Sequence, residues 1–333
     1  MRELVDFSLC RHLPNIYGGA SRKRRIITTA FDGQPRRAMM KFGRQNASTK
    51  PGYQDSYTNA PINEDITCRI FQAAGIPTQQ TILGAWRGHS VVACLDFTDN
   101  GRNLTLIPFG HLETSDMTDA MFTANRDYPE LTDIESLIRN CDTLAPCRKD
   151  ALIRFRQMVC VDALVGNFDR HTGNWGYLMD NATDAIIGPA PIYDCGSALM
   201  PRLGEPSSMQ SLMTEPERLN KQMMRLPLTR MLVRDRQLTY GELLLVPDAA
   251  SVRTELPGIM RRLSKSVTDR IIDDTAGISD TRRKFYKTII DIRRQLILEP
   301  AYRLALDEQR ERRANDPRLM VNDPTMDDAH TYR

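Results

Sequence analysis

Three polar residues near the middle of the chain have the types and spacing that phosphoryl transfer requires. Asp169 and Asn174 are five positions apart, and Asp194 follows twenty residues later. Transfer of a phosphoryl group to a hydroxyl needs a carboxylate that orients the attacking oxygen, and oxygen ligands that hold Mg²⁺ against nucleotide phosphates. The Asp-x-x-x-x-Asn spacing fits this chemistry. Because Asp and Asn are also common in turns, this spacing alone does not establish a catalytic site. The elements around the loop have to provide further evidence.

The segments around this loop favour one shared cleft. The apolar run from Ile153 to Val165 has helical spacing, and Trp175 to Met179 has the pattern of a short strand. Pro191 to Tyr193 is interpreted as a second strand. This order of helix, loop, strand, turn and strand places Asn174 and Asp194 at strand ends beside the same cleft.

A predicted hairpin upstream carries a lysine that could complete the site. Arg25 to Phe31, an Asp-Gly turn and Ala38 to Phe42 indicate two antiparallel strands. By strand alternation Lys41 points to the same side as Met39, toward the interior or a cleft. A lysine that extends into solvent from a strand end is the other interpretation. Gly18-Gly19, just upstream, is either a loop that covers phosphates or a plain turn.

The next element is predicted to be a helix from Ile62 to Ala74, with apolar residues at helical spacing and Gly75-Ile76-Pro77 at its end. Glu64 falls in its first turn. This residue is either a surface acid that complements the helix dipole or the partner of Lys41. The residues alone leave both roles open.

The remaining elements indicate an α+β fold, with a small β-rich part at residues 1–97 and a larger, mainly helical part at residues 98–306. The charged segment 307–333 is predicted to be poorly ordered. The stretch from Thr98 to Asp127 is polar and irregular. The other predicted elements are strands at Gln80–Ala85 and Ser90–Phe97, and helices at Ile134–Arg139, Ala151–Val165, Met209–Met213, Pro216–Met224, Leu226–Leu245, Ala249–Leu263 and Asp280–Leu298.

Composition restricts the class of protein. The 333 residues are 41% hydrophobic and 26% charged, as in ordinary globular proteins. No apolar run approaches the ~18 residues needed to cross a bilayer, and Met1 to Leu13 lacks a signal-peptide core, so a cytoplasmic protein without membrane contact is predicted. Seven scattered cysteines without a CxxC pair argue against a disulfide framework or structural zinc. A formal net charge of +3 does not indicate nucleic-acid binding.

In chain order, these residues resemble the HipA-like kinase family, and most closely its compact CtkA-like branch. The resemblance runs from about Gly18 to Leu199 and weakens through the helical remainder. It depends on the Asp-Arg-His-x-x-Asn loop in company with Asp194. The upstream features that match are Gly19-Ala20-Ser21-x-Lys23, Lys41, Asn63-Glu64 and Cys94-Leu95-Asp96-Phe97.

The resemblance implies a bilobal protein-kinase-like fold that binds ATP and Mg²⁺ and phosphorylates serine or threonine, itself included. Asp169 would be the catalytic base, Lys41 would bind the α/β-phosphates, and Glu64 would orient Lys41. Asn174 and Asp194 would bind Mg²⁺. The other implied contacts are a phosphate-covering loop of Gly19, Ala20, Ser21 and Lys23, and an adenine-binding edge of Cys94, Leu95, Asp96 and Phe97.

Regulation and partners are also implied. In HipA-type kinases phosphorylation of a serine in this loop switches the enzyme off, and Ser21 is the nearest candidate. His171 is interpreted as a structural hydrogen-bonding residue of the catalytic loop. A protein substrate and an antitoxin-like partner are predicted. Cys195-Gly196 follows Asp194, the implied metal ligand, in place of Phe-Gly. The way in which eukaryotic kinases are activated is therefore not assumed for this protein.

Two other functions stay open. Phosphoinositide kinases have a similar Asp-Arg-His-x-x-Asn loop, so the acceptor could be a hydroxyl of a lipid or a small molecule. A non-catalytic nucleotide-binding module of the toxin–antitoxin type is the third hypothesis.

Overall fold

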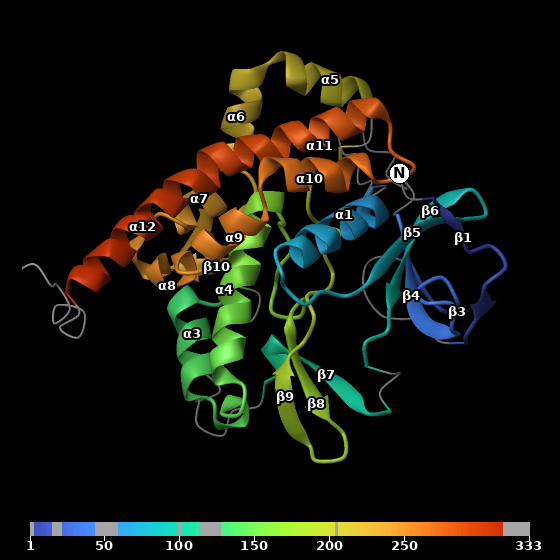
Figure 1. The fold of residues 1–333 in the computed structure, drawn as a ribbon, viewed down its shortest axis with the longest axis horizontal. Coiled ribbons are helices and arrows are strands. Elements are labelled where there is room, and N and C mark those ends of the chain that lie inside the picture. The colour runs from blue at the N-terminus through green and yellow to red at the C-terminus, as the bar shows by residue number, and fades with distance from the viewer. Residues whose placement is uncertain are drawn as a thin grey trace, which may run out of the picture.

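The computed structural model describes residues 3–14, 22–43, 59–98, 102–112, 128–203 and 206–315. Figure 1 shows a smaller lobe with a β-sheet, in blue and cyan, beside a larger lobe made mainly of helices, in green to red. The predicted α+β fold with a β-rich first lobe and a mainly helical second lobe is confirmed.

The sheet of the first lobe positions Lys41. Its six described strands have the order β1-β5-β6-β4-β3-β2, and the predicted hairpin is confirmed as antiparallel β3 (Lys23–Thr28) and β4 (Arg36–Phe42). Ala38 and Met40 of β4 belong to the small core of this lobe. Strand alternation therefore turns Lys41 to the other face. The other strands are β1 (Val5–Asp6), β2 (Arg11–His12), β5 (Thr81–Trp86) and β6 (His89–Leu95).

Helix α1 (Ala60–Ala73) packs against β5 and β6. It begins two residues earlier than predicted, with a proline in its first positions, where the missing N–H costs nothing. Glu64 therefore lies in the second turn, and only 1% of it is exposed. The interpretation of Glu64 as a surface acid is wrong.

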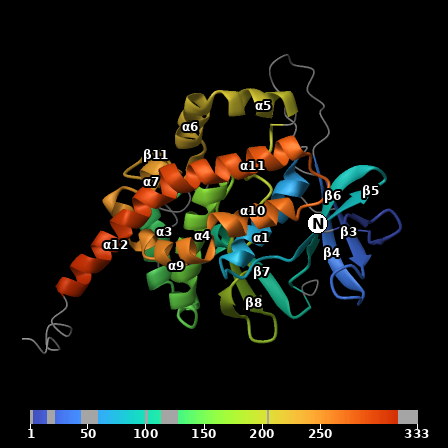
Figure 2. The ribbon, with the colours of Figure 1, turned by 45° about the horizontal axis from the view of Figure 1, so that its top comes forward.

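Contacts with the second lobe fix α1 in place. The Tyr286 hydroxyl donates to Asn63 Oδ1 at 2.6 Å, and Asn63 Nδ2 donates to the carbonyl of Ala198 at 2.8 Å. Arg69 donates to the carbonyl of Ile271 and to the Thr275 hydroxyl. Figure 2 shows α1 beneath α10 (Lys265–Asp273) and α11 (Asp280–Arg293). The position of Glu64 therefore depends on both lobes.

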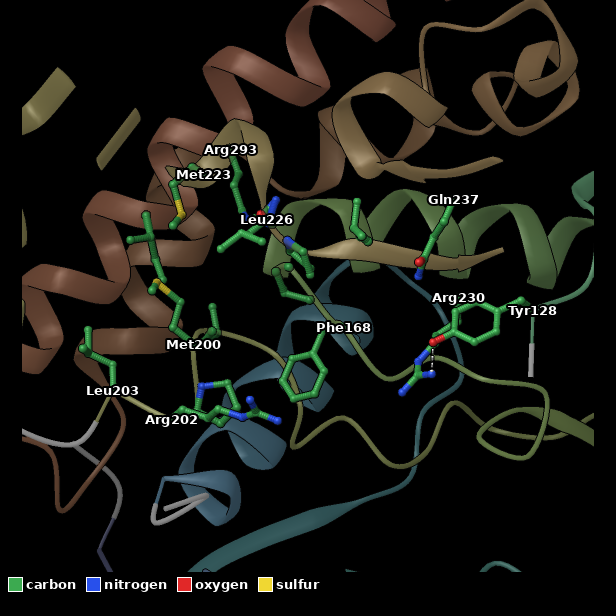
Figure 3. A pocket seen from close by; sticks show the side chains of 17 residues that line it. Tyr128, Phe168, Met200, Arg202, Leu203, Met223, Leu226, Arg230, Gln237 and Arg293 are labelled. Carbon is green, nitrogen blue, oxygen red and sulfur yellow. Dashed lines mark hydrogen bonds between the residues drawn. The ribbon is translucent and has the colours of Figure 1, made fainter. Parts of the chain in front are cut away.

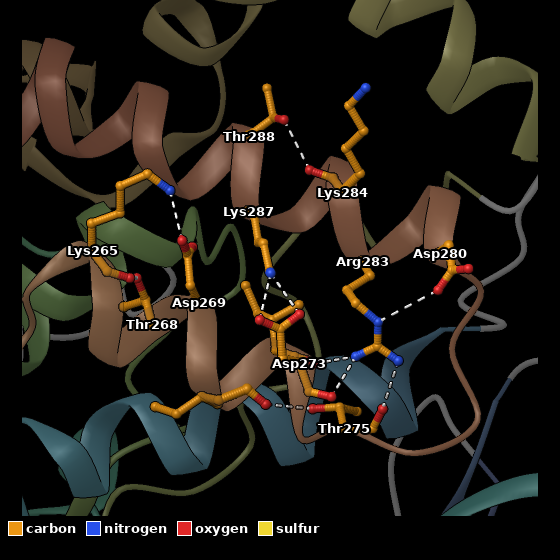
Figure 4. A network of polar contacts seen from close by, with 12 residues as sticks. Lys265, Thr268, Asp269, Asp273, Thr275, Asp280, Arg283, Lys284, Lys287 and Thr288 are labelled. Carbon is orange, nitrogen blue, oxygen red and sulfur yellow. Dashed lines mark hydrogen bonds and ion pairs between the residues drawn. The ribbon is translucent and has the colours of Figure 1, made fainter. Parts of the chain in front are cut away.

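A polar network joins α10 to α11 (Figure 4). Arg283 donates to the carbonyls of Ile272 and Asp273, and Lys287 forms an ion pair with the Asp273 carboxylate. Exposed ion pairs contribute little, about 0–1 kcal/mol each. The guanidinium bonds to carbonyls at the end of α10 are the more specific contacts, because they satisfy groups that the helix itself leaves unpaired.

Helices α3 (Leu131–Asn140) and α4 (Arg148–Val165) confirm the two helices predicted there. Residues 158–165 of α4 are all buried, so this helix runs through the core of the second lobe. Gly166 ends it in the left-handed conformation, with φ of 66°. A Cβ at Gly166 would also lie 2.7 Å from the Arg293 guanidinium. Glycine is therefore required at the point where the catalytic loop begins.

A second sheet consists of β7 (Leu104–Pro108), β8 (Gly176–Asp180) and β9 (Ala185–Pro189). The strand predicted at Trp175–Met179 is confirmed as β8, whereas β7 lies inside the stretch predicted to be irregular. Its five residues pair with a strand about seventy positions later, and a local pattern cannot show such a partner.

The strand predicted at Pro191 to Tyr193 is wrong. Only Ile192 pairs, in a single bridge with Thr78, because Pro189 and Pro191 just before it lack the N–H that a ladder needs. That bridge nevertheless joins the lobes: the Ile192 N–H donates to the carbonyl of Pro77, and the Gln79 N–H donates to the carbonyl of Ile192. It fixes the chain directly before Asp194.

The helix predicted from Leu226 to Leu245 is also wrong. This segment forms the hairpin of β10 (Leu228–Val233) and β11 (Arg236–Thr239), followed by the short helix α7 (Tyr240–Leu243). Burial alternates along β10 with the two-residue period of a strand. Arg234 and Asp235 both have positive φ, as a two-residue hairpin turn requires.

The remaining helices complete the second lobe, and α8 and α9 among them pack against α4. Helix α12 (Glu299–Ala314) continues past residue 307, where the poorly ordered tail is predicted to begin, so that prediction is wrong for residues 307–314; residues 316–333 lie outside the described residues. A π-helical turn, Arg294–Leu298, joins α11 to α12. The others are α5 (Pro206–Thr214), α6 (Pro216–Arg225), α8 (Ala250–Arg253) and α9 (Leu256–Arg262).

The seven cysteines are all free, and six of them are buried. No helix within the described ranges is long and apolar enough to cross a membrane.

Candidate active site

Lys41 lies at the centre of a charge cluster between the lobes, in which Lys41 and Glu64 are buried and Asp194 is partly exposed. Its Nζ is 3.0 Å from Glu64 Oε1 and 3.0 Å from Asp194 Oδ1. Glu64 Oε1 also accepts the backbone N–H of Cys195 at 3.0 Å. A Cβ at Gly196 would come within 3.0 Å of Glu64 Oε2, so the small residue there leaves room for the glutamate. Three segments that are far apart in sequence thus meet at one ammonium group.

The charges of this cluster stabilise one another. Burial alone lowers the pKa of Lys41, but the carboxylates of Asp194 and Glu64 raise it well above its ordinary value. The ammonium of Lys41, against the opposing effect of burial and with help from Lys23, lowers the pKa of Asp194 to about 2. Lys41 is therefore a cation and Asp194 an anion throughout the physiological range.

Asp194 has an unusual backbone conformation, with φ of 55°. A non-glycine residue in this region costs roughly 1–3 kcal/mol and persists only where neighbouring contacts impose it. Here Lys41 holds its side chain and Glu64 holds the next N–H. The strain turns the Asp194 carboxylate toward the cavity between the lobes.

A buried ion pair supports the loop between α4 and β8 from behind. Arg170 Nε donates to Asp162 Oδ2 at 2.7 Å, and the same guanidinium donates to the carbonyls of Asn174 and Tyr193. Asp162 also accepts from Asn167 Nδ2 at 3.1 Å. Arg170 therefore fixes α4, the loop and the chain before Asp194 relative to one another, a role that its sequence position alone did not reveal.

Within the loop, Asn174 Nδ2 donates to the backbone carbonyl of Asp169 at 2.8 Å. Asp169 Oδ1 accepts from Arg230 Nη2 at 2.9 Å. His171 Nδ1 accepts the N–H of Gly173 at 3.0 Å, which agrees with its interpretation as a structural residue. The Asp169 carboxylate is one-third exposed and reachable by an acceptor.

A cavity of about 580 Å³, the interlobe cavity, opens beside these groups. The predicted residues Lys23, Lys41, Cys94, Asp96, Phe97, Asn174 and Asp194 line it. Asp169 lies next to it in the loop but is not on its wall. Leu95 also does not line it: its N–H donates to the carbonyl of Gln80, and its carbonyl accepts from Gln79 Nε2. Glu64 lies behind Lys41. Gly19, Ala20 and Ser21 lie outside the described residues.

Other residues of the cavity wall did not emerge from the sequence. They include Gln79, Tyr193 and the β7 residues Leu104, Thr105 and Leu106. The short apolar alternation of β7 is the one signal that could have revealed part of this wall. No signal in the sequence pointed to Arg230, which contacts Asp169 from β10, because its segment was predicted to be helical.

The two predicted metal residues fit Mg²⁺ by the chemistry of their donors. Asn174 uses its amide nitrogen on Asp169, so its oxygen remains as the ligand atom. Asp194 engages Lys41 through Oδ1, which leaves Oδ2. Mg²⁺ prefers hard oxygen ligands and usually takes only one or two protein groups besides phosphates and water.

The lobes, the cavity between them and the Lys41–Glu64–Asp194 cluster are those of the protein-kinase-like fold. A family model described as the HipA-like C-terminal domain matches residues 16–270. The chain belongs to this family, as the sequence predicts.

Relatives support the same assignment. The chain is 28% identical over 331 residues to the serine/threonine-protein kinase CtkA of Helicobacter pylori, covering 98% of this chain and 97% of that protein. It is also similar to the crystal structure of the H. pylori proinflammatory kinase CtkA, with a TM-score of 0.75 and 26% identity over 92% of this chain and 100% of that one. The kinase-like fold and the resemblance to CtkA are thus confirmed.

A more distant likeness is to HipA of Shewanella oneidensis in complex with HipB and its operator DNA. The TM-score is 0.46 at 14% identity, over 90% of this chain and 75% of that one. This similarity is too low to carry an argument.

Proposed function

We propose that this protein is an ATP-dependent serine/threonine protein kinase of the HipA/CtkA type. The observation that supports this most is Lys41 Nζ, 3.0 Å from both Glu64 and Asp194 on the wall of the interlobe cavity. Kinases use such a lysine–glutamate pair, together with a metal-binding aspartate, to hold nucleotide phosphates. The identity to CtkA over nearly the full length of both chains supports the same activity.

In the proposed reaction each group has one task. Lys41 would bind the α/β-phosphates of ATP, and Glu64 would orient Lys41. Asn174 and Asp194 would hold Mg²⁺, which would supply neutralisation of the charge on the transferred phosphoryl group. The serine or threonine oxygen forms a bond to the γ-phosphorus while the bond from that phosphorus to ADP breaks. Asp169 accepts the proton of the attacking hydroxyl. Cys94, Asp96 and Phe97, which line the cavity, would contact the adenine.

Incubation of the full-length protein with radiolabelled ATP and Mg²⁺ tests this function. Transfer of label to a protein acceptor, the chain itself included, is expected, and EDTA should abolish it. Label only on a lipid or a small alcohol would assign the other phosphotransferase class. Nucleotide binding without transfer to any acceptor would indicate a non-catalytic module.

Autophosphorylation belongs to the same proposal. Mapping of phosphorylated residues after exposure to ATP tests Ser21 as the modified residue, with Ser21→Ala as its control. The antitoxin-like partner and the cytoplasmic location stay predictions from the sequence.

A further inference from the structure

A second cavity, of about 590 Å³, lies in the second lobe beside the catalytic loop (Figure 3). It shares no lining residue with the interlobe cavity. Phe168, next to the proposed base, forms part of its wall, and Leu199 to Pro201 of the segment after Asp194 form another part. The cavity therefore lies next to Asp169 and is separate from the interlobe cavity. We call it the acceptor cavity.

The wall of the acceptor cavity is mainly apolar. Met223 and Ile289 are side chains of α6 and α11 that reach it, and Leu226 and Leu228 lie at its rim with 52% and 42% of their surface exposed. Exposed apolar side chains around a hollow are typical of a surface that binds another molecule. An apolar group of a partner would bury this surface.

The charges of the same wall have one sign. Arg202, Arg230 and Arg293 line the cavity, and none of its lining residues in the described chain is acidic. Arg202 lies over the Phe168 ring, with its guanidinium carbon 5.5 Å from the ring centroid. An apolar hollow whose charged lining residues, within the described chain, are all arginines complements a ligand that is apolar and acidic.

Arg293 contributes a positive charge to this wall that is retained at neutral pH. It is 3% exposed, and it donates to the carbonyls of Ala163 and Leu226. Within the described ranges it forms no ion pair with a carboxylate. Burial lowers its pKa to about 10, so it remains a cation at neutral pH.

Arg230 connects the acceptor cavity to the chemistry. Its guanidinium donates to Asp169 Oδ1 at 2.9 Å and to the Tyr128 hydroxyl at 2.6 Å, and it lines the cavity at the same time. A carboxylate that enters the cavity competes with Asp169 for this guanidinium. Release of Asp169 Oδ1 leaves it available to accept the hydroxyl proton, so an acidic residue near the acceptor hydroxyl would assist the reaction.

We infer that the acceptor cavity binds the protein substrate, and that it selects a bulky apolar side chain together with an aspartate or glutamate close to the phosphorylated serine or threonine. The inference deepens the proposed kinase function and rests on it for the identity of the reaction. The binding preference itself follows from the wall of the cavity. Arg202 and Arg230 are assigned to the acidic residue, and Leu228 to the apolar one.

An array of serine peptides, in which each flanking position is varied in turn, tests the inference in two ways. Binding of the fluorescently labelled full-length protein reports the preference without turnover, and radiolabelled ATP reports transfer on the same array. The wild-type protein should bind peptides with leucine, methionine or phenylalanine at one position, and with aspartate or glutamate at a nearby one, about 10-fold better than peptides with alanine or lysine there.

Reversal of the charge of Arg202 gives the variant that tests the inference most directly. Arg202→Glu should change the preferred residue at the acidic position to lysine or arginine while the apolar preference stays. Leu228→Ala, at an exposed position, should weaken the apolar preference alone. Arg261→Glu on the exposed face of α9 is the matched control and should change neither. Thermal unfolding of each variant verifies that it is folded.

The outcomes separate the two proposals. Binding without preference, no binding, or an unchanged preference in Arg202→Glu would overturn the acceptor cavity, whatever the transfer result. A preference that reverses in Arg202→Glu, but with no transfer of label to any acceptor, would retain the cavity as a binding site for acidic apolar peptides and overturn the kinase function.

Discussion

The two cavities beside the catalytic loop differ in how they are built. Both lobes form the interlobe cavity, and its charged groups have both signs. The acceptor cavity belongs to the second lobe, with an apolar wall and three arginines. We propose ATP and Mg²⁺ for the first and a protein acceptor for the second. The residues proposed for the nucleotide lie in short motifs of the sequence, whereas those proposed for the acceptor come together only on folding.

The largest effect is expected at Asp169, which adjoins both cavities. Asp169→Asn removes the proton acceptor and should lower the rate of phosphoryl transfer by about 10²–10⁴-fold. ATP binding should persist, because Asp169 does not line the interlobe cavity. Single-turnover transfer and nucleotide titration measure the two quantities. A variant that transfers phosphate at the wild-type rate would remove Asp169 from the mechanism.

Loss of charge should affect stability very differently in the two cavities. Lys41→Met leaves Glu64 and Asp194 without their cation, and breaking a buried pair in this way costs about 3–5 kcal/mol of unfolding free energy. Arg293→Met should cost less, because no carboxylate pairs with it in the described structure and burial of its charge is itself unfavourable. Urea unfolding compares them.

A second substitution checks the origin of the Lys41 effect. Glu64→Gln in the Lys41→Met background should recover part of the lost stability, since it removes one of the two unpaired charges. Equal stability of Lys41→Met and Arg293→Met would contradict the proposed difference between the cavities.

A smaller effect is expected at low pH. Because Lys41 lowers the pKa of Asp194 from 3.8 to about 2, ionised Asp194 stabilises the folded state fully above about pH 4, and this contribution is lost as the pH falls toward 2. Asp194→Asn lacks it. The difference in melting temperature between wild type and Asp194→Asn should therefore shrink between pH 4 and pH 2. A constant difference would show that Asp194 does not titrate there.

The smallest effect is expected for the energetic coupling between the two cavities, which a double variant measures. Gln79→Ala removes the hydrogen bond to the Leu95 carbonyl and should raise the KM for ATP roughly 5-fold, as expected for about 1 kcal/mol. Leu228→Ala should raise the KM for peptide instead. Since the two sites share no lining residue, the double variant should show the sum of both free energies within about 0.5 kcal/mol. A larger deviation would mean that the two cavities communicate.

Prediction from the sequence was most successful where a short segment contains its own pattern. The hairpin of β3 and β4 follows from alternation around an Asp-Gly turn, and the helical spacing in α4 predicts the element before the catalytic loop. Lys41 was expected on the cleft side for the same reason. Prediction failed for β7 and for β10, because their pairing partners or neighbours decide their conformation, and a run of five or six residues fits more than one structure.

The sequence by itself determined the family, the two-lobed fold and the order of the groups that phosphoryl transfer needs. The tertiary structure alone decided that Glu64 faces Lys41 instead of solvent, that Arg170 fixes the loop through Asp162, and that Arg230 connects Asp169 to a second cavity. The physical reason is range. Turns and amphipathic patterns act between neighbours in the chain, whereas these three ion pairs join side chains of separate elements and form only after the core has packed.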